Sequence, residues 1–133
     1  MTTAVRDLVA DYIQSVGDGR LDHVAALLHP ELDFGGTTAV ELHGAGAYLA
    51  ALERLSPIIE RNDIRQIVVD GDRAVVVYDF VTDTEVGAVL TAESLVVEDG
   101  RIRSITLLFD WRRWPEVLAE LGRRSAQPVA ADA

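Results

Sequence analysis

The 133-residue chain contains no cysteine, which excludes disulfide bonds and thiolate chemistry. It also lacks any apolar run near the roughly 18 residues that a membrane-spanning helix needs. Its first ten residues already carry Arg6 and Asp7, so they lack the apolar centre of a secretion signal. We therefore expect a soluble, cytoplasmic protein with no membrane partner.

Basic residues are scarce, with 12 against 22 acidic residues and a formal net charge of -10. Such a surface repels phosphate backbones, and nucleic-acid binding normally needs clustered basic side chains. The one dense basic group lies near the C-terminus, where many carboxylates accompany it, and comprises Arg112, Arg113, Arg123 and Arg124. We interpret this group as a solvated face or a subunit contact, and we expect no nucleic-acid partner.

Patterns that bind metals or cofactors are also missing. The histidines, His23, His29 and His43, show none of the spacings typical of metal ligands. The run Gly44-Ala45-Gly46 lacks the preceding long strand and the third glycine of a nucleotide-binding loop. We recognise no serine nucleophile with a nearby histidine. The sequence therefore predicts neither a metal nor a cofactor.

The composition that remains, 49% hydrophobic and 26% charged, is typical of a soluble globular protein. A chain of this length can bury a working core without disulfides or metals. We see no internal repeat and no composition shift that would mark a boundary. Residues 1–124 are predicted to form a single domain, and the Ala-rich residues 125–133 a flexible C-terminal tail.

The first half of the chain has helical periodicity. One apolar stripe recurs at helical spacing from residue 5 to residue 16, and Gly17 ends it: Val5, Leu8, Val9, Tyr12, Ile13 and Val16. A second short helix covers residues 21–28, and Pro30 stops it. Residues 31–36 form a short strand, and a third helix opens at Gly44 and ends near Pro57.

The second half changes to strand-like runs over residues 64–70, 73–83, 88–98 and 101–111. The turns between them are too short for crossover helices, so neighbouring strands pair antiparallel. A final helix is predicted over residues 114–121. Helices followed by strands indicate an α+β fold. We expect a cone, in which a strongly curved antiparallel sheet wraps around the N-terminal helices and leaves an apolar cavity for a small hydrophobic ligand.

Three stretches of sequence carry a resemblance to a known family: DYIQSVGDGRLDHVAALLHPELDF, LHGAGAYLAAL and DGRIRSITLLFDWRRW. In these stretches the chain resembles the SnoaL-like branch of the nuclear transport factor 2-like superfamily. That branch includes polyketide cyclases, and ketosteroid isomerases and limonene-epoxide hydrolases are its relatives. The resemblance spans about residue 5 to residue 114. It implies the cone fold, but one such fold hosts many functions, so function depends on the site.

The resemblance to ketosteroid isomerases implies two oxyanion-hole residues, Tyr12 and Glu93. A buried phenol can donate to a carbonyl oxygen that gains negative charge. Glu93 stands in an otherwise apolar strand, where burial raises the pKa of a carboxyl and keeps it neutral. The alternatives are a core tyrosine at position 12, and a Glu93 that faces outward or pairs with Arg103.

The general base of the isomerases falls near Gly36, which cannot take a proton. Asp33 is close in sequence but has the opposite strand parity, so steroid isomerisation by that mechanism is not expected. The resemblance to limonene-epoxide hydrolases and polyketide cyclases instead implies Asp110 and Asp79 as acid and base. The bridging arginine of the hydrolases is replaced by Val77. The alternatives are a cap of the following helix for Asp110 and an exposed residue for Asp79.

Strand alternation predicts which side chains line the pocket. The predicted ligand-contacting set comprises Phe34, His43, Tyr48, Val77, Leu95, Leu107, Phe109 and Trp111. His43 is placed at the mouth of the cavity, with a solvated loop histidine as the alternative. On the strand over residues 73–83, either the set with Val77 and Asp79 or the set with Val76, Tyr78 and Phe80 faces the interior, and the other faces a partner.

Two functions are compatible with these residues. The first is a cofactor-free enzyme of the cyclase, isomerase or epoxide hydrolase type, in which Asp110 or Asp79 moves a proton and Tyr12 and Glu93 hold an oxyanion. The second is a non-catalytic binding or assembly module with the same pocket. A homodimer is expected through a sheet face that carries Val76, Tyr78 and Phe80, with Val96 and Leu108 beside them.

Overall fold

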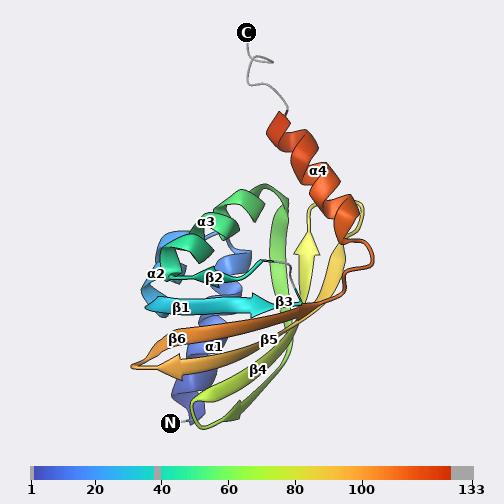
Figure 1. Cartoon of the computed structure of the whole chain (residues 1–133). Coiled ribbons are helices and arrows are strands. Elements are labelled where there is room, and N and C mark those ends of the chain that lie inside the picture. The colour runs from blue at the N-terminus through green and yellow to red at the C-terminus, as the bar shows by residue number, and fades with distance from the viewer. Residues whose placement is uncertain (1, 38–39, 127–133) are drawn as a thin grey trace.

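The computed structural model describes residues 2–37 and 40–126 as an α+β cone in which helices line a curved, open sheet (Figure 1). The elements are α1 (Thr2–Gly17), α2 (Leu21–Leu27), β1 (Leu28–Gly36), β2 (Leu42–His43), α3 (Ala45–Leu55), the 3-10 turn η1 (Ser56–Ile58), β3 (Ile59–Asp70), β4 (Arg73–Thr82), β5 (Ala88–Glu98), β6 (Arg101–Phe109) and α4 (Trp114–Ala126).

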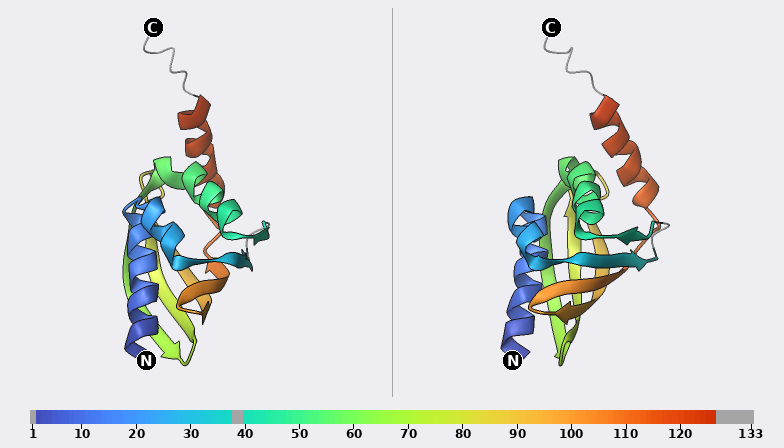
Figure 2. Two further views of the ribbon diagram at one scale, coloured as in Figure 1. Left: turned by 90° about the vertical axis from the view of Figure 1, so that its left-hand side faces the viewer. Right: turned by 60° about the vertical axis from the view of Figure 1, so that its left-hand side comes forward.

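The six strands form one sheet in the order β2-β1-β6-β5-β4-β3. The four long strands from β3 to β6 pair antiparallel, as their short connections predict. The sheet as a whole is mixed, because β1 runs parallel to β6. Helix α1 lies along β3 and β4, while α3 packs on β1 and β2 (Figure 2).

The core forms where the apolar stripe of α1 meets the concave face of the sheet. Val9, Tyr12 and Ile13 are fully or almost fully buried there. On β5 every second residue from Thr91 to Val97 faces inward, because strand side chains alternate between the two faces. Among residues 2–37 and 40–126, no helix is long and apolar enough to cross a membrane.

Strand β4 turns Val76, Tyr78 and Phe80 toward the helices and Val75, Val77 and Asp79 to the outside. The expectation that Val76, Tyr78 and Phe80 form a dimer face is therefore wrong. The reason is packing: Val76 and Tyr78 belong to the core that α1 covers. Val77 and Asp79 consequently do not face the interior that holds Glu93.

Several element boundaries differ from those that the sequence predicts. β1 begins at Leu28 and β3 at Ile59, because α2 and η1 end directly before them. β3 carries two register shifts, which break the alternation used to recognise strands. Helix α4 reaches Ala126, so it includes the first two residues of the predicted tail. Residues 127–133, the rest of that tail, lie outside the described residues.

Gly36 has a backbone geometry that explains the missing isomerase base. Its φ angle is 133°, and a Cβ placed on it would lie 2.0 Å from the carbonyl oxygen of Leu107. A side chain at this position would clash with the backbone of β6. The local fold therefore leaves no room for the carboxylate side chain that the isomerases carry at this position.

The substitution Gly36→Ala is expected to lower the free energy of unfolding by about 2–3 kcal/mol, because it combines backbone strain with this clash. Urea unfolding measures the loss. Gly35→Ala is the matched control: its Cβ would meet only the Cγ of Glu41, at 3.7 Å. We expect the control to stay within about 0.5 kcal/mol of the parent chain. Equal losses in both variants would contradict this account.

Candidate functional site

The carboxyl group of Glu93 lies in the middle of the buried sheet face, where only 3% of the residue is exposed. The hydroxyl of Tyr12 donates to its Oε1 at 2.9 Å, and the hydroxyl of Tyr78 donates to its Oε2. The hydroxyl of Tyr48 lies 2.5 Å from that of Tyr12. Helices α1 and α3 and strands β4 and β5 thus each contribute one member of a buried cluster, the Tyr–Glu cluster.

Burial sets the protonation of this cluster. It raises the pKa of Glu93, and the hydrogen bonds from Tyr78 and Tyr12 lower it only in part. Burial also raises the pKa of Tyr12, Tyr48 and Tyr78 well above the ordinary value, and the Glu93 charge adds to the effect. The three hydroxyls therefore keep their protons at neutral pH, and the carboxyl is shifted toward its neutral form.

Each tyrosine hydroxyl has one proton to donate. Because Tyr12 donates to Glu93, the short contact between Tyr12 and Tyr48 requires Tyr48 to be the donor. When Glu93 takes up a proton, one carboxyl oxygen becomes a donor, and the bond with Tyr78 can reverse its direction. The cluster is thus a set of linked donors in a water-poor interior, an arrangement able to polarise an oxygen atom of a ligand.

Much of the predicted ligand-contacting set surrounds this cluster. Leu95, Leu107 and Phe109 share the inner face with Glu93, since the β5–β6 register places them beside or opposite it. The ring of Phe34 stacks on that of Tyr48, with centroids 4.8 Å apart. The fold therefore brings these apolar side chains and the tyrosines of the helices around one carboxyl.

Asp79 lies on the opposite, outer face of the sheet. Its carboxylate accepts hydrogen bonds from Arg65, from Nε at 3.0 Å and from Nη2 at 3.1 Å. This pairing matches the exposed alternative that the sequence left open. With the sheet between them, Asp79 and Glu93 cannot act on one ligand.

Asp110 follows the inward-facing Phe109 and directs its carboxylate to Arg112. Arg112 binds both carboxylate oxygens, and its backbone N–H donates to Oδ1 at 3.0 Å. The side-chain and backbone bonds lower the pKa of Asp110 to about 2. An aspartate this acidic is ionised at neutral pH, so it is not an acid there and is a weak base. The predicted Asp79–Asp110 pair is not assembled beside the Tyr–Glu cluster.

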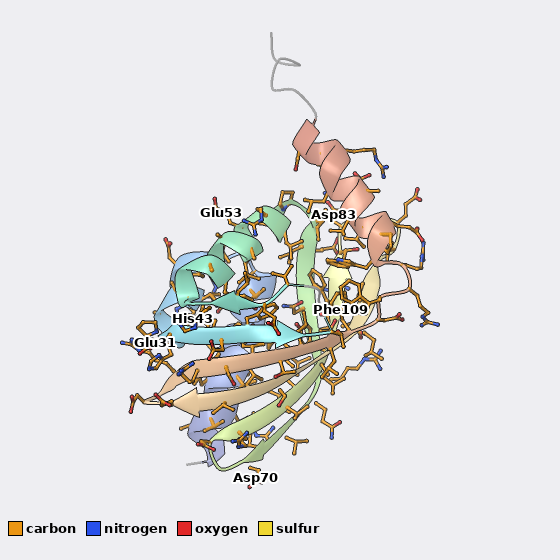
Figure 3. The ribbon with its side chains drawn as sticks, viewed as in Figure 1. Glu31, His43, Glu53, Asp70, Asp83 and Phe109 are labelled. Atoms are coloured by element: carbon orange, nitrogen blue, oxygen red, sulfur yellow. The ribbon has the colours of Figure 1, made fainter. Side chains whose placement is uncertain are left out.

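His43 lies at the sheet edge formed by β1 and β2, away from the interior (Figure 3). Its Nδ1 lies 2.7 Å from a carboxylate oxygen of Asp33, whose other oxygen accepts from Arg103 at 3.1 Å. The bonds from His43 and Arg103 lower the pKa of Asp33. His43, Asp33 and Phe34 belong to a shallow surface hollow of about 420 Å³.

Two further hollows lie at the surface. One of about 470 Å³ lies between α4 and the β4–β5 turn, and one of about 490 Å³ lies between the end of α1 and the start of β3. Neither these two nor the hollow at His43 is lined by Glu93, Tyr12 or Tyr78. The Tyr–Glu cluster itself is buried, with Glu93, Tyr12 and Tyr78 each at most 6% exposed, so a ligand reaches it only if neighbouring side chains move.

Within the part of the chain that the structure describes, His29, Glu98 and Asp99 group side chains able to ligate a metal, with ligand atoms within 4.8 Å of one another. The backbone N–H of Glu31 donates to Nδ1 of His29, so in the neutral ring the proton sits on Nε2. That nitrogen faces Glu98 at 3.5 Å and has no free electron pair for a metal. The group fits an ordinary surface ion pair better than a metal site.

Three residues of the site and its surroundings were not predicted in their roles. Tyr78 binds Glu93, while Arg65 and Arg112 neutralise the two aspartates. Tyr78 belonged to one of the two sets of β4 residues that could face inward. On β5, Glu93 alternates with Thr91 and Leu95, which places its carboxyl on an inner face where it needs a hydrogen-bond partner, and this was the available signal for Tyr78. The arginine pairings depend on cross-strand register, which single-sequence patterns do not give.

Comparison with known proteins supports the fold. The SnoaL-like domain family matches residues 9–105, which is more than half of the chain. The chain belongs to this family. No curated protein sequence matches it.

Solved structures show the same architecture at low identity. A proposed ketosteroid isomerase from Kribbella flavida has a TM-score of 0.74 and 21% identity over 82% of this chain and 79% of its own. A proposed SnoaL-like polyketide cyclase from Shewanella putrefaciens has a TM-score of 0.70 and 16% identity over 87% and 86%. An NTF2-like protein of unknown function from Cytophaga hutchinsonii has a TM-score of 0.71 and 19% identity over 83% and 93%. At these identities the likeness establishes the fold alone.

The raised pKa of Glu93 predicts a pH dependence of stability. A group whose pKa is raised on folding stabilises the fold below its ordinary pKa, here 4.5, and that contribution is lost as the pH rises through the folded pKa. Glu93→Gln removes the titration, so its free energy of unfolding should fall less between about pH 4.5 and pH 7 than that of the parent chain. Urea unfolding across this range provides the comparison, with exposed Glu53→Gln as control. If the free energy of unfolding depends on pH in the same way in the parent chain and in Glu93→Gln, the prediction is wrong.

Proposed function

We propose that the chain binds a small, largely apolar molecule inside the cone and holds one oxygen atom of it with the Tyr–Glu cluster. The observation that carries this proposal is the enclosed carboxyl of Glu93, which two tyrosine hydroxyls reach from opposite sides. A buried polar group costs about 1–3 kcal/mol when it lacks a partner. Glu93, placed among Leu95, Leu107 and Val76, avoids that cost only because Tyr12 and Tyr78 supply its partners, and an apolar side chain would fill the same place with no such requirement.

The favoured ligand oxygen is a carbonyl or a phenolic hydroxyl. When Glu93 is protonated its O–H can donate to Tyr12, which frees the Tyr12 proton for a ligand carbonyl, whereas an ionised Glu93 or the Tyr48 oxygen can accept from a ligand hydroxyl. Free carboxylates and phosphates are disfavoured, because the interior offers no arginine or lysine to neutralise them and burying an unpaired charge is costly. The ligand class is thus neutral and mostly apolar, as in polyketide-like or terpenoid metabolites.

Binding without proton abstraction is the form of the proposal that the geometry supports best. Gly36 stands where the isomerases carry their base, and Asp79 and Asp110 are held by arginines away from the cluster. In the described residues, no second carboxylate is hydrogen-bonded into the cluster. A cyclase, isomerase or hydrolase activity would need one of these aspartates to leave its arginine and reach the interior. The cluster itself can polarise a ligand oxygen, but it supplies no general base.

Paired ligands that differ by a single oxygen test the binding proposal. The parent chain should bind 2-naphthol about tenfold more tightly than naphthalene, which equals one good hydrogen bond in a dry site. Tyr12→Phe and Glu93→Gln should each reduce this preference to about threefold or less, while naphthalene binding stays within about twofold. Fluorescence titration measures both constants.

Asp79→Asn and Asp110→Asn are the matched controls, since both remove a carboxylate charge outside the interior. Neither should alter the preference for 2-naphthol. A preference that survives Tyr12→Phe and Glu93→Gln, or one that disappears in an aspartate variant, would refute the assignment of the oxygen site to the Tyr–Glu cluster.

We also propose that two copies associate through the outer face of the sheet. Four large apolar side chains on β3 to β6 are 42–52% exposed there: Val68, Val75, Leu90 and Leu108. The register connects them through Val77 and Ala92: Val68 pairs with Val75 across β3–β4, Val77 pairs with Ala92 across β4–β5, and Ala92 pairs with Leu108 across β5–β6. A continuous apolar strip of this kind is typical of an interaction surface, and a two-fold axis lets the same strip cover itself.

Light scattering tests the oligomeric state. The parent chain should have the mass of a dimer, and Leu90→Asp combined with Leu108→Asp should give a folded monomer. Leu118→Asp is the control, because Leu118 is 47% exposed on α4, away from the strip. A monomeric parent chain, or a dimer that survives the double substitution, contradicts the proposed face.

A further inference from the structure

Three aromatic rings fill the end of the interior next to the Tyr–Glu cluster. Phe109 on β6 belongs to the cross-strand row of Thr91 and Tyr78, one row away from Glu93. Its ring meets the edge of Trp114 at a centroid distance of 5.1 Å, and Phe80 on β4 lies 6.2 Å from Trp114. These rings occupy the space through which a ligand would extend from the cluster toward the end of the cone.

Trp114 belongs to α4, which is not part of the sheet or of the helical layer that covers it. Figures 1 and 2 show α4 beyond the ends of β4 and β5, at the opposite end of the molecule from the N-terminus. Val117, one turn after Trp114, is fully buried, so the first turn of α4 is seated on the fold. Val117 and the partly buried Trp114 are thus the side chains of α4 that cover the end of the cone.

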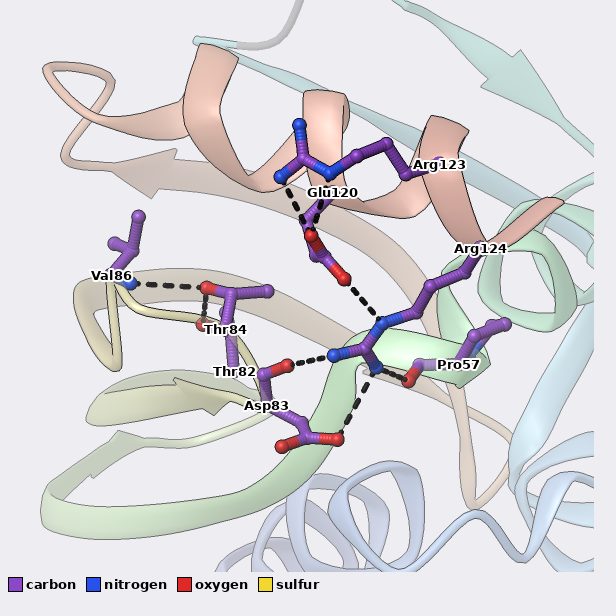
Figure 4. A network of polar contacts seen from close by, with 8 residues as sticks. All are labelled: Pro57, Thr82, Asp83, Thr84, Val86, Glu120, Arg123 and Arg124. Carbon is purple, nitrogen blue, oxygen red and sulfur yellow. Dashed lines mark hydrogen bonds and ion pairs between the residues drawn. The ribbon is translucent and has the colours of Figure 1, made fainter. Parts of the chain in front are cut away.

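In the second half of α4, the side chain of Arg124 hydrogen-bonds to other parts of the fold (Figure 4). Its guanidinium donates to the carbonyl of Pro57 at 2.7 Å, and to the carbonyl and the carboxylate of Asp83 at 2.5 Å and 3.2 Å. It also binds Glu120 on its own helix, at 2.9 Å. Arg124 therefore joins α4 to η1 and to the end of β4 at the same time.

We propose that α4 is a lid over the ligand site, that Arg124 is its latch, and that Trp114 occupies the place of a flat, neutral aromatic ligand. This inference rests on the proposed function and names its ligand class more closely. When Arg124 is released and the first turn of α4 moves off the fold together with Val117, the indole leaves Phe80 and Phe109, and a planar ring system enters the same space with its oxygen toward Glu93. The indole is the template for the ligand: planar, apolar and about two fused rings wide.

The chemistry of the surroundings favours this class. Phe80 and Phe109 offer ring faces and edges, and contacts between aromatic rings are favourable beyond the burial of apolar area itself. A ligand that replaces Trp114 regains those contacts, whereas an aliphatic chain regains only the apolar area. The latch consists of partly exposed bonds, which are weak individually and can exchange with water. Opening is therefore reversible, and the observed affinity equals the affinity of the open form multiplied by the fraction of molecules in which the lid is open.

A titration with the neutral, oxygen-free probe N-phenyl-1-naphthylamine tests the lid. Arg124→Gln should bind it about five- to tenfold more tightly than the parent chain, since loss of the latch raises the open fraction. Arg123→Gln is the matched control, because within the described residues Arg123 hydrogen-bonds to Glu120 on its own helix and forms no hydrogen bond to the sheet or to η1. The control should stay within about twofold of the parent chain.

Trp114→Ala supplies the second variant. It empties the proposed site, so the probe should bind more tightly than to the parent chain, and adding Arg124→Gln should then change the affinity by less than about twofold. Circular dichroism verifies that each variant keeps the fold. Equal affinities in the parent chain and Arg124→Gln, or independent effects of the two substitutions, would overturn the lid.

The probe lacks an oxygen for Glu93, so this experiment is separate from the test of the Tyr–Glu cluster. If the substitutions at positions 114 and 124 act as expected while Tyr12→Phe leaves the preference for 2-naphthol intact, the lid stands and the oxygen site falls. If the preference depends on Tyr12 but the probe ignores positions 114 and 124, the oxygen site stands and the lid is wrong.

Discussion

The site depends on one buried carboxyl group and the hydroxyls that meet it. Glu93 projects from β5 into a core built from α1 and the concave sheet, and Tyr12 and Tyr78 satisfy its two oxygens. A carboxylate left unpaired in such a place would be strongly destabilising. The burial that makes the group costly also raises the pKa of Glu93, so the same constraint links the stability of the core to its ability to donate a hydrogen bond.

The curved sheet separates two chemical environments. Its inner face carries the Tyr–Glu cluster and aromatic rings, whereas its outer face carries Asp79 beside an exposed apolar strip. Because alternate residues of β4 serve both faces, Tyr78 and Asp79 are neighbours in sequence but lie on opposite sides of the protein. Arg65 binds both carboxylate oxygens of Asp79, and Arg112 binds both of Asp110 and lowers the pKa of Asp110 to about 2, so both carboxylates are engaged away from the cluster.

Sequence patterns predicted the order of the helices and long strands, because helical stripes, alternation and short turns are local signals. They placed Tyr12 on the apolar stripe of the first helix but left open whether Glu93 faces inward or outward, and the β5 alternation that put Thr91, Glu93 and Leu95 on one face is confirmed. They could not choose between the two faces of β4, since Val75, Val76 and Val77 are apolar in both directions. The start of β3, the parallel β1–β6 pair and the pairing of Asp110 with Arg112 depend on register shifts and on long-range contacts that no local pattern carries.

The protonation of Glu93 can be observed directly by infrared spectroscopy. At a pH well above 4.5, where exposed glutamates are ionised, the parent chain should retain a carbonyl band of a protonated carboxyl group, and that band should be absent from Glu93→Gln. Tyr12→Phe should shift the band, because the oxygen loses a hydrogen bond. A spectrum in which every carboxyl group is ionised at that pH would contradict the central claim that the core holds a neutral, donating carboxyl.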